Sequence, residues 1–200
     1  MKHLPLLKEA TQRQHRQLEA LPVMRQLLAP DFSIDEYRSL LQCQYGLYAH
    51  LEGMMAPFLG TLPRETFHWH WFTASSRLAS DLRAMGDQPF VPASLSFPFQ
   101  MSARSQALGC CYVLLGAGFG ARMIAPKLAQ SLGPDTPMSF YQDGQPHLKP
   151  LWRQLENLLD AASEDGAIQE SINAARDTFA LFFRAFQGLS HSEHREVLPQ

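Results

Sequence analysis

The chain has 200 residues, of which 46% are hydrophobic and 18% are charged, and its formal net charge at pH 7 is −2. This balance excludes an intrinsically disordered protein, and a chain of this length can bury enough apolar surface for one core and one pocket. The near-neutral charge gives no electrostatic reason to expect nucleic acid or an anionic membrane as a partner. We therefore expect a single domain spanning residues 1–200.

The amino-terminal part of the chain has the apolar spacing of helices. Apolar residues recur three and four positions apart over about 4–20, and Pro22 ends or bends this helix. Ser33 followed by Glu36 has the pattern of a capping box, which opens a second helix that Pro57 closes.

The rest of the chain continues the same pattern, with glycine and proline at the breaks. In chain order we expect a helix over 72–85 stopped at Gly86, a loop over 87–101, a long apolar helix over 102–131 and a loop over 132–145. Pro146 then opens a helix over 148–160, and the last helix covers 168–189. No alternating pattern of useful length indicates a strand. The predicted fold class is all-α, a bundle of six to eight helices.

Three glycines interrupt the middle of the long apolar helix, at Gly116, Gly118 and Gly120. Each costs a helix about 0.5–1 kcal/mol relative to alanine, so their presence needs a reason. One reason is close packing of two helices, and another is a kink that lets backbone approach a flat ligand. A dinucleotide-binding turn is excluded, because that motif must follow a strand.

His15 is a candidate metal ligand on the first helix. Glu19 lies four residues later, so its carboxylate shares the helix face and can reach the imidazole. Axial ligation of haem iron needs a ring nitrogen on an apolar face with the other nitrogen held by an acceptor. The alternative is an ordinary surface or core histidine.

Other candidate residues have weaker patterns. Two histidine pairs have spacings seen in metal sites, but no cysteine or carboxylate cluster accompanies them; they are His68 with His70 and His191 with His194. Phe179, Phe182, Phe183 and Phe186 have the spacing of core aromatics, with stacking on a porphyrin as the alternative. Trp152 with Arg153 has the spacing of an amphipathic edge. Cys110 and Cys111 are expected to be small buried thiols, with a catalytic nucleophile as the alternative.

The cellular compartment is inferred from the cysteine pattern and from two tests, one for a signal peptide and one for a membrane span. The odd count of three, with one adjacent pair, is typical of a reducing compartment. The apolar run at the amino terminus is too short for a signal peptide, and the longest uncharged stretch, Ser105 to Ala121, is shorter than a membrane span. We expect a cytoplasmic protein that does not enter a membrane.

Four segments, in order along the chain, resemble the haem oxygenase family, in particular its bacterial biliverdin-producing members. They are Leu7-Lys-Glu-Ala-Thr-Gln-Arg-Gln-His15 with Glu19, Tyr45-Gly-Leu-Tyr-Ala-His-Leu-Glu52, Leu115-Gly-Ala-Gly-Phe-Gly-Ala121, and Ala174-Ala-Arg-Asp-Thr-Phe179. The first is similar to the helix that carries the proximal histidine in that family, and the third is similar to the helix that covers the oxygen-binding face of haem.

The resemblance implies a function and a site. Haem is then both cofactor and substrate, bound through iron to His15 and opened with O2 to biliverdin, CO and ferrous iron. It implies a catalytic role for the distal helix at Gly116, Ala117 and Gly120, where glycine leaves room for bound oxygen. It implies haem contacts from Lys8, which meets a propionate, and from Glu19, Tyr112, Phe119 and Phe179. The implied electron donor is a ferredoxin or flavoprotein reductase, and a photoreceptor is a candidate user of the biliverdin.

Three positions depart from the family pattern. Ala117 stands where other members have aspartate or serine, so proton delivery there would rely on backbone carbonyls and ordered water. Ala121 replaces a commoner glycine, and Glu170 stands where other members have a basic anchor. Two alternatives therefore stay open: a haem carrier or sensor without turnover, and a thiamin-pyrimidine hydrolase on a similar helical scaffold.

Overall fold

A computed structural model describes residues 2–93, 95, 100–143, 145–162 and 166–192. The α-helices in this part of the chain are α1 (His3–Glu19), α2 (Pro22–Gln26), α3 (Ile34–Met55), α4 (Trp69–Phe72), α5 (Ser75–Ala84), α6 (Arg104–Leu132), α7 (Ser139–Gln142), α8 (Leu148–Ala161) and α9 (Ala167–Ser192). Six of them are long, and α2, α4 and α7 have five residues or fewer. None of the residues described is in a strand, so the predicted all-α class is confirmed.

Some expected element boundaries were wrong. A π-helical turn over Ala56–Gly60 includes Pro57 and extends α3, so Pro57, which has no N–H to continue the α-helical ladder, changes the type of helix instead of closing it. The helix expected over 72–85 is divided at Thr73 and Ala74 into α4 and α5. The expected loop over 132–145 contains α7. Part of the loop expected over 87–101 lies outside the described residues.

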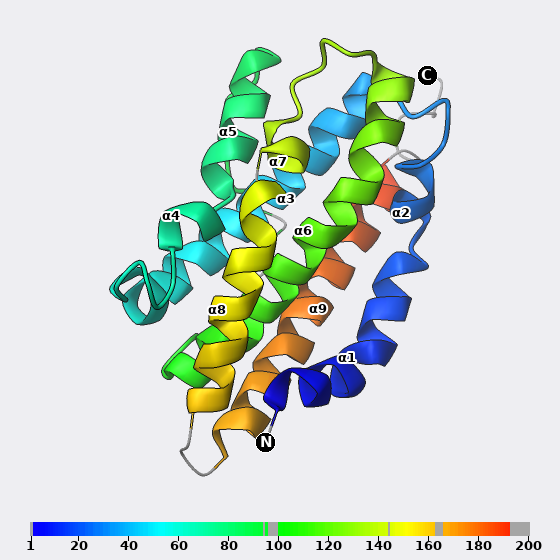
Figure 1. Ribbon diagram of the computed structural model, residues 1–200. Coiled ribbons are helices and arrows are strands. Elements are labelled where there is room, and N and C mark those ends of the chain that lie inside the picture. Colours follow the sequence, from blue (N-terminus) through cyan, green and yellow to red (C-terminus); the bar gives the residue numbers. More distant parts are fainter. Residues whose placement is uncertain (1, 94, 96–99, 144, 163–165, 193–200) are drawn as a thin grey trace.

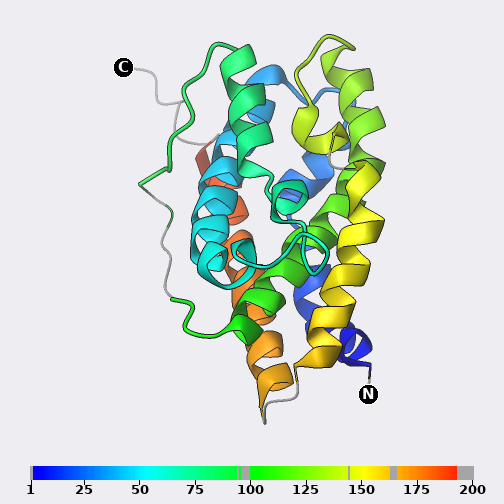
Figure 2. The ribbon, with the colours of Figure 1, turned by 60° about the vertical axis from the view of Figure 1, so that its left-hand side comes forward.

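The long helix α6 is the centre of the bundle. It packs along α9 and α8, and α1 packs against α9 as well (Figure 1). Its glycines do not break it, since α6 runs without interruption from Arg104 to Leu132. At Gly109 the helices α6 and α9 are in backbone contact, because a Cβ there would lie 2.1 Å from the carbonyl oxygen of Ser171. Figure 2 shows α3 and α5 on the side of α6 away from α1.

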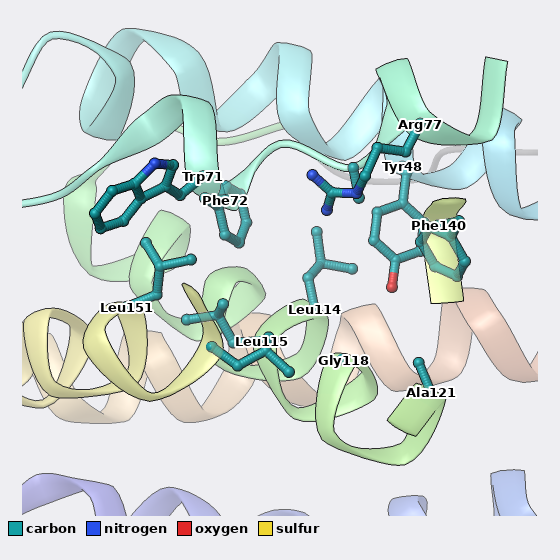
Figure 3. A pocket seen from close by; sticks show the side chains of 12 residues that line it. Tyr48, Trp71, Phe72, Arg77, Leu114, Leu115, Gly118, Ala121, Phe140 and Leu151 are labelled. Carbon is teal, nitrogen blue, oxygen red and sulfur yellow. The ribbon is translucent and has the colours of Figure 1, made fainter. Parts of the chain in front are cut away.

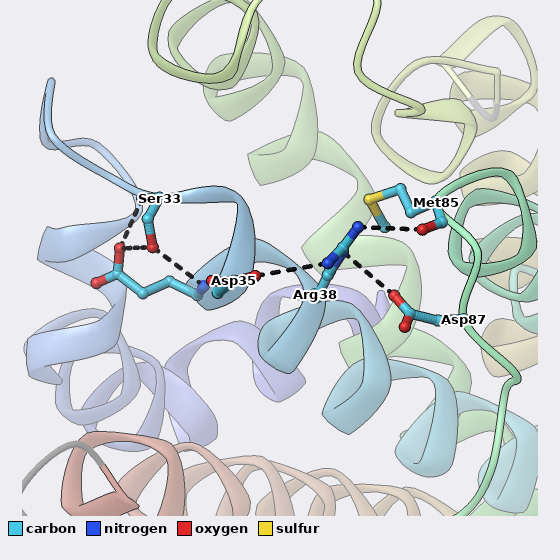
Figure 4. A network of polar contacts seen from close by, with 6 residues as sticks. Ser33, Asp35, Arg38, Met85 and Asp87 are labelled. Atoms are coloured by element: carbon cyan, nitrogen blue, oxygen red, sulfur yellow. Dashed lines mark hydrogen bonds and ion pairs between the residues drawn. The ribbon is translucent and has the colours of Figure 1, made fainter. Parts of the chain in front are cut away.

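Polar contacts join the start of α3 to the end of α5 (Figure 4). The predicted capping box is present: the backbone N–H of Glu36 donates to Ser33 Oγ at 3.2 Å, and Ser33 N–H donates to the Glu36 carboxylate at 2.6 Å. In the next turn of α3, Arg38 donates to the carbonyl of Met85 at 3.1 Å and pairs with Asp87 at 3.3 Å. The end of α5 is therefore held against the first turns of α3.

Among the described helices, α6 alone is long and apolar enough to span a membrane by length and hydropathy. Half of its most apolar window is buried inside the protein. The central helix of a helical bundle passes the same test, because it too is apolar on most sides.

Candidate functional site

A cavity of about 480 Å³ lies between α1 and α6. This volume is within the range of ordinary ligand pockets. Its lining comes from helices far apart in the sequence: His15, Leu18 and Glu19 on α1, Met24 and Leu27 near α2, Leu40, Gln44 and Tyr48 on α3, eight residues of α6 between Tyr112 and Ile124, Phe140 and Tyr141 on α7, Trp152 on α8, and Phe179, Phe182 and Phe186 on α9. The walls are mostly apolar, with few polar side chains.

On the α1 wall, His15 is held by two neighbours. Its Nδ1 lies 3.1 Å from Oε2 of Glu19, as the four-residue spacing predicted. Its ring stands edge-on to Phe179, with 5.9 Å between the ring centroids. More than half of the His15 side chain is exposed, and the residue lines the cavity. Since Nδ1 faces Glu19, the second ring nitrogen is the one left for a ligand.

On the α6 wall, the three glycines have two different roles. Cβ atoms added at Gly116 or Gly120 would meet no neighbour within 4 Å, and both residues line the cavity. A Cβ at Gly118 would lie 2.6 Å from Cδ2 of Leu148, so Gly118 lets α8 pack closely on α6. Close packing therefore accounts for Gly118, while Gly116 and Gly120 leave the α6 backbone open to the cavity, and a kink toward a flat ligand stays a prediction. Ala117 also lines the cavity and presents only a methyl group.

Aromatic side chains close one edge of the cavity. Trp152 on α8 is edge-on to Phe119 at 5.4 Å and tilted against Tyr112 at 5.7 Å between ring centroids. Trp152 was expected to be an ordinary amphipathic edge, but it lines the cavity. Its contact partners come from α6, and the sequence periodicity of α8 alone contains no information about them.

Five lining residues on α3 and α7 were missed as site residues: Leu40, Gln44, Tyr48, Phe140 and Tyr141. Gln44 had a detectable signal, because it is a polar residue in the apolar stripe of α3, one turn before Tyr48. Burial raises the pKa of Tyr48 and of Tyr141, so both phenols stay protonated. The residues of α7 had no such signal, since the segment was predicted as a loop.

A second, much smaller cavity of about 30 Å³ adjoins the first, and Tyr48, Ala121 and Phe140 line both. Figure 3 shows Arg77 and Tyr48 extending into it toward α6. The Arg77 Nη1 donates to the carbonyl of Thr73 at 2.9 Å. This space is sufficient for about one water molecule.

The remaining predicted positions are Lys8 and Glu170, which do not line the large cavity, and Ala121, which is buried within its wall. Lys8 is exposed and does not line the cavity, so its contact with a propionate stays a prediction. Ala121 is buried in the wall at 6% exposure. Glu170, which replaces a basic residue of the family, accepts a hydrogen bond from the hydroxyl of Ser105 at the start of α6.

Among the residues that the structure describes, the cysteines and the other histidines form no second site. Cys43, Cys110 and Cys111 are free and buried, and burial raises the pKa of Cys110 to about 12, which keeps the thiol protonated. Among the described residues, no group of three His, Cys, Asp or Glu side chains is placed to hold a metal ion. The side chains of His191 and His194 lie outside the described residues.

Comparison with known proteins gives a consistent result. The haem oxygenase family model matches residues 2–85. The haem complex of haem oxygenase-1 from the cyanobacterium Synechocystis superposes with a TM-score of 0.78 at 16% identity, covering 96% of this chain and 94% of that one. The NO- and CO-bound haem oxygenase of Neisseria meningitidis gives 0.70 at 21% identity, over 94% and 92% of the two chains.

A third structure, the haem oxygenase of Leptospira interrogans, gives a TM-score of 0.70 at 17% identity and covers 94% of this chain and 100% of that one. A search of curated protein sequences finds no match. Identities this low show a common fold alone, and the family model adds a sequence match over the segment that contains His15. The chain therefore resembles the haem oxygenase family in the sequence of residues 2–85 and has the haem oxygenase fold along nearly its whole length.

Proposed function

We propose that this protein is a haem oxygenase, which binds haem through His15 and opens the ring to biliverdin with release of CO and ferrous iron. One observation supports this most strongly: a largely apolar cavity lies between an imidazole on α1 and a glycine-lined stretch of α6. The haem iron supplies the oxygen chemistry, and reducing equivalents would come from a ferredoxin or a flavoprotein reductase.

The residues that line the cavity fit a haem group. His15 offers a ring nitrogen to the iron at the cavity wall, and Glu19 beside Nδ1 orients the ring. Histidine ligation also avoids the strong electron donation of a thiolate, which favours cleavage of the O–O bond. Leu18, Phe179 and Phe182 supply apolar surface for a flat macrocycle.

The α6 wall limits what can lie above the ring. Because Gly116 and Gly120 have no side chains, and an added Cβ at either would have nothing within 4 Å, the helix backbone can lie close to the ligand. Ala117 carries no proton donor, so the cavity must supply hydrogen bonds from backbone groups, ordered water or other helices.

Ala117 supports a second candidate function, a haem carrier or sensor without turnover, because it lacks the polar side chain that the family most often has at this position. The thiamin-pyrimidine hydrolase alternative has no support in the site, because both adjacent thiols are buried and protonated. A cytoplasmic location and delivery of biliverdin to a photoreceptor stay proposals.

A haem titration followed by turnover tests the proposal. Purified protein is loaded with haem and given a reductant under air while the Soret band is followed. Loss of that band with growth of biliverdin absorption supports the oxygenase, and a haem absorption that persists supports the carrier.

The His15→Ala variant tests the ligand. We expect it to lose the native axial spectrum and to recover it when free imidazole is added. His70→Ala is the matched control, because His70 is exposed and does not line the cavity. An unchanged haem spectrum in His15→Ala would assign the ligand to another residue.

A further inference from the structure

Asp81 is a buried carboxylate, 3% exposed, that holds the start of α7. Its Oδ1 accepts hydrogen bonds from the backbone N–H of Ser139 at 2.9 Å and from Ser139 Oγ at 2.7 Å. Its Oδ2 accepts from the backbone N–H of Phe140 at 2.9 Å. A helix of four residues has little stability of its own, so these bonds from α5 help to fix where α7 lies.

The position of α7 determines where two aromatic rings enter the cavity wall. Phe140 stands edge-on to Tyr48, with 5.2 Å between ring centroids. Tyr141 is 2% exposed and donates from its hydroxyl to Oε1 of Gln44 at 3.2 Å. Burial raises the pKa of Tyr141, and the negative charge of Asp81 raises it further, so the phenol keeps the proton that it donates.

The bond from Tyr141 sets the orientation of the Gln44 amide. Because Oε1 is taken by the phenol, the NH₂ group of Gln44 is turned the other way. No described residue accepts a hydrogen bond from Nε2 of Gln44, and Gln44 lines the cavity. The amide therefore presents its two N–H donors to the cavity.

This donor matters because the facing helix offers few: of the α6 residues that line the cavity, Tyr112 alone has a side-chain N–H or O–H. From Val113 to Ile124, the residues of α6 that line the cavity are glycine, alanine and apolar side chains. Away from Tyr112, a polar ligand group or ordered water on this side must find its side-chain donor on another helix.

We propose that Asp81 is a positioning residue for the cavity: through α7 and Tyr141 it directs the amide of Gln44 into the cavity, where Gln44 donates a hydrogen bond to the bound ligand or its ordered water. The proposal rests on the haem oxygenase function proposed above. Its first test does not require haem, so the two can fail separately.

The first test follows the side-chain amide resonances of Gln44 in ¹⁵N-labelled protein without haem, assigned with a Gln44→Leu variant. We expect Asp81→Asn and Tyr141→Phe each to shift these resonances, because each removes a step that orients the amide. If Asp81→Asn does not fold, Tyr141→Phe still tests the last step. Unshifted resonances in Tyr141→Phe would overturn the proposal.

Glu52→Gln is the matched control. Glu52 is also a buried carboxylate that caps a helix, since it accepts from the backbone N–H of Ala74 at 2.6 Å and of Ser75 at 3.1 Å at the start of α5. We expect a similar loss of melting temperature in Glu52→Gln and Asp81→Asn, with the Gln44 resonances shifted only in the latter. Equal shifts in both would indicate general loosening and would overturn the proposal.

The second test separates turnover from binding in the haem-loaded protein. We expect kcat to fall about tenfold in Tyr141→Phe and Gln44→Leu, the effect of one lost hydrogen bond of about 1.4 kcal/mol, while the Kd for haem changes less than about threefold. The Asp81→Asn, Tyr141→Phe double variant should lose no more than the worse single variant.

If the wild-type protein degrades haem, two results would overturn the functional role of the Gln44 amide. One is a kcat loss in the double variant equal to the sum of the two single losses, and the other is an unchanged kcat in these variants. A wild-type protein that binds haem and does not degrade it would instead overturn the proposed function, while the apoprotein resonances would still decide whether Asp81 orients Gln44.

Discussion

Glycines on the same helix should respond in opposite directions to alanine substitution, and Gly120 and Gly109 are the clearest pair. At Gly120 an added Cβ meets nothing within 4 Å, so alanine adds only its better helix propensity. That difference is about 0.8–1 kcal/mol, which for a chain of this size raises Tm by about 2–4 °C. The same methyl group projects into the cavity and should weaken haem binding or turnover.

At Gly109 the same substitution places Cβ 2.1 Å from the backbone oxygen of Ser171, where ordinary contact begins at 3.4 Å. Because the obstacle is backbone, α6 and α9 must separate by about 1 Å, and overpacking of this kind costs roughly 3 kcal/mol or more. After the gain in helix propensity, we expect a net loss of about 2 kcal/mol and a fall in Tm of about 4–8 °C.

The assay is thermal unfolding of both apoproteins by circular dichroism, followed by haem titration of the variants that fold. The expected result is a higher Tm with weaker haem binding for Gly120→Ala, and a lower Tm for Gly109→Ala. If Gly120→Ala lowers Tm as Gly109→Ala does, Gly120 serves helix packing and the reasoning about the cavity wall is wrong. Unchanged haem binding and turnover in Gly120→Ala would show that the ligand does not approach this part of α6.

Two further predictions follow from the contacts around His15 and from the buried thiols. Glu19→Ala removes the partner of His15 Nδ1 and should weaken haem binding about 10–100-fold, measured as the rate of haem dissociation. Glu9→Ala is the control, because Glu9 is on the same helix but outside the cavity. Equal dissociation rates in the two variants would show that Glu19 does not support the ligand. Because the pKa of Cys43 and Cys110 is raised from 9.0 to about 12 in the folded state, their protonated form contributes stability below about pH 9 that is lost as pH rises toward 12. A thiol reagent should therefore label the native protein slowly at pH 8 and rapidly only after unfolding, and fast native labelling would contradict the burial of these thiols.

The local features of this protein follow from its amino-acid sequence alone. Ser33 and Glu36 are three residues apart, and His15 and Glu19 are four apart, so each pair meets on one helix whatever the rest of the chain does. The all-α class and the six long helices follow from periodicity within each segment. The sequence of the glycine-containing segment also indicated where α6 was unusual, although not which glycine faced which neighbour.

Which residues share the cavity depends instead on tertiary packing. Trp152, Gln44 and Tyr141 come from three helices, and their proximity depends on how α8, α3 and α7 pack around α6. The helix α7 is the strongest example, because four residues do not form a stable helix alone and the carboxylate of Asp81, 58 residues earlier, supplies the missing hydrogen bonds. Contacts between distant segments leave no periodic signal within either one, so the parts of the cavity wall formed by α3, α7 and α8 could be identified only after the chain was folded.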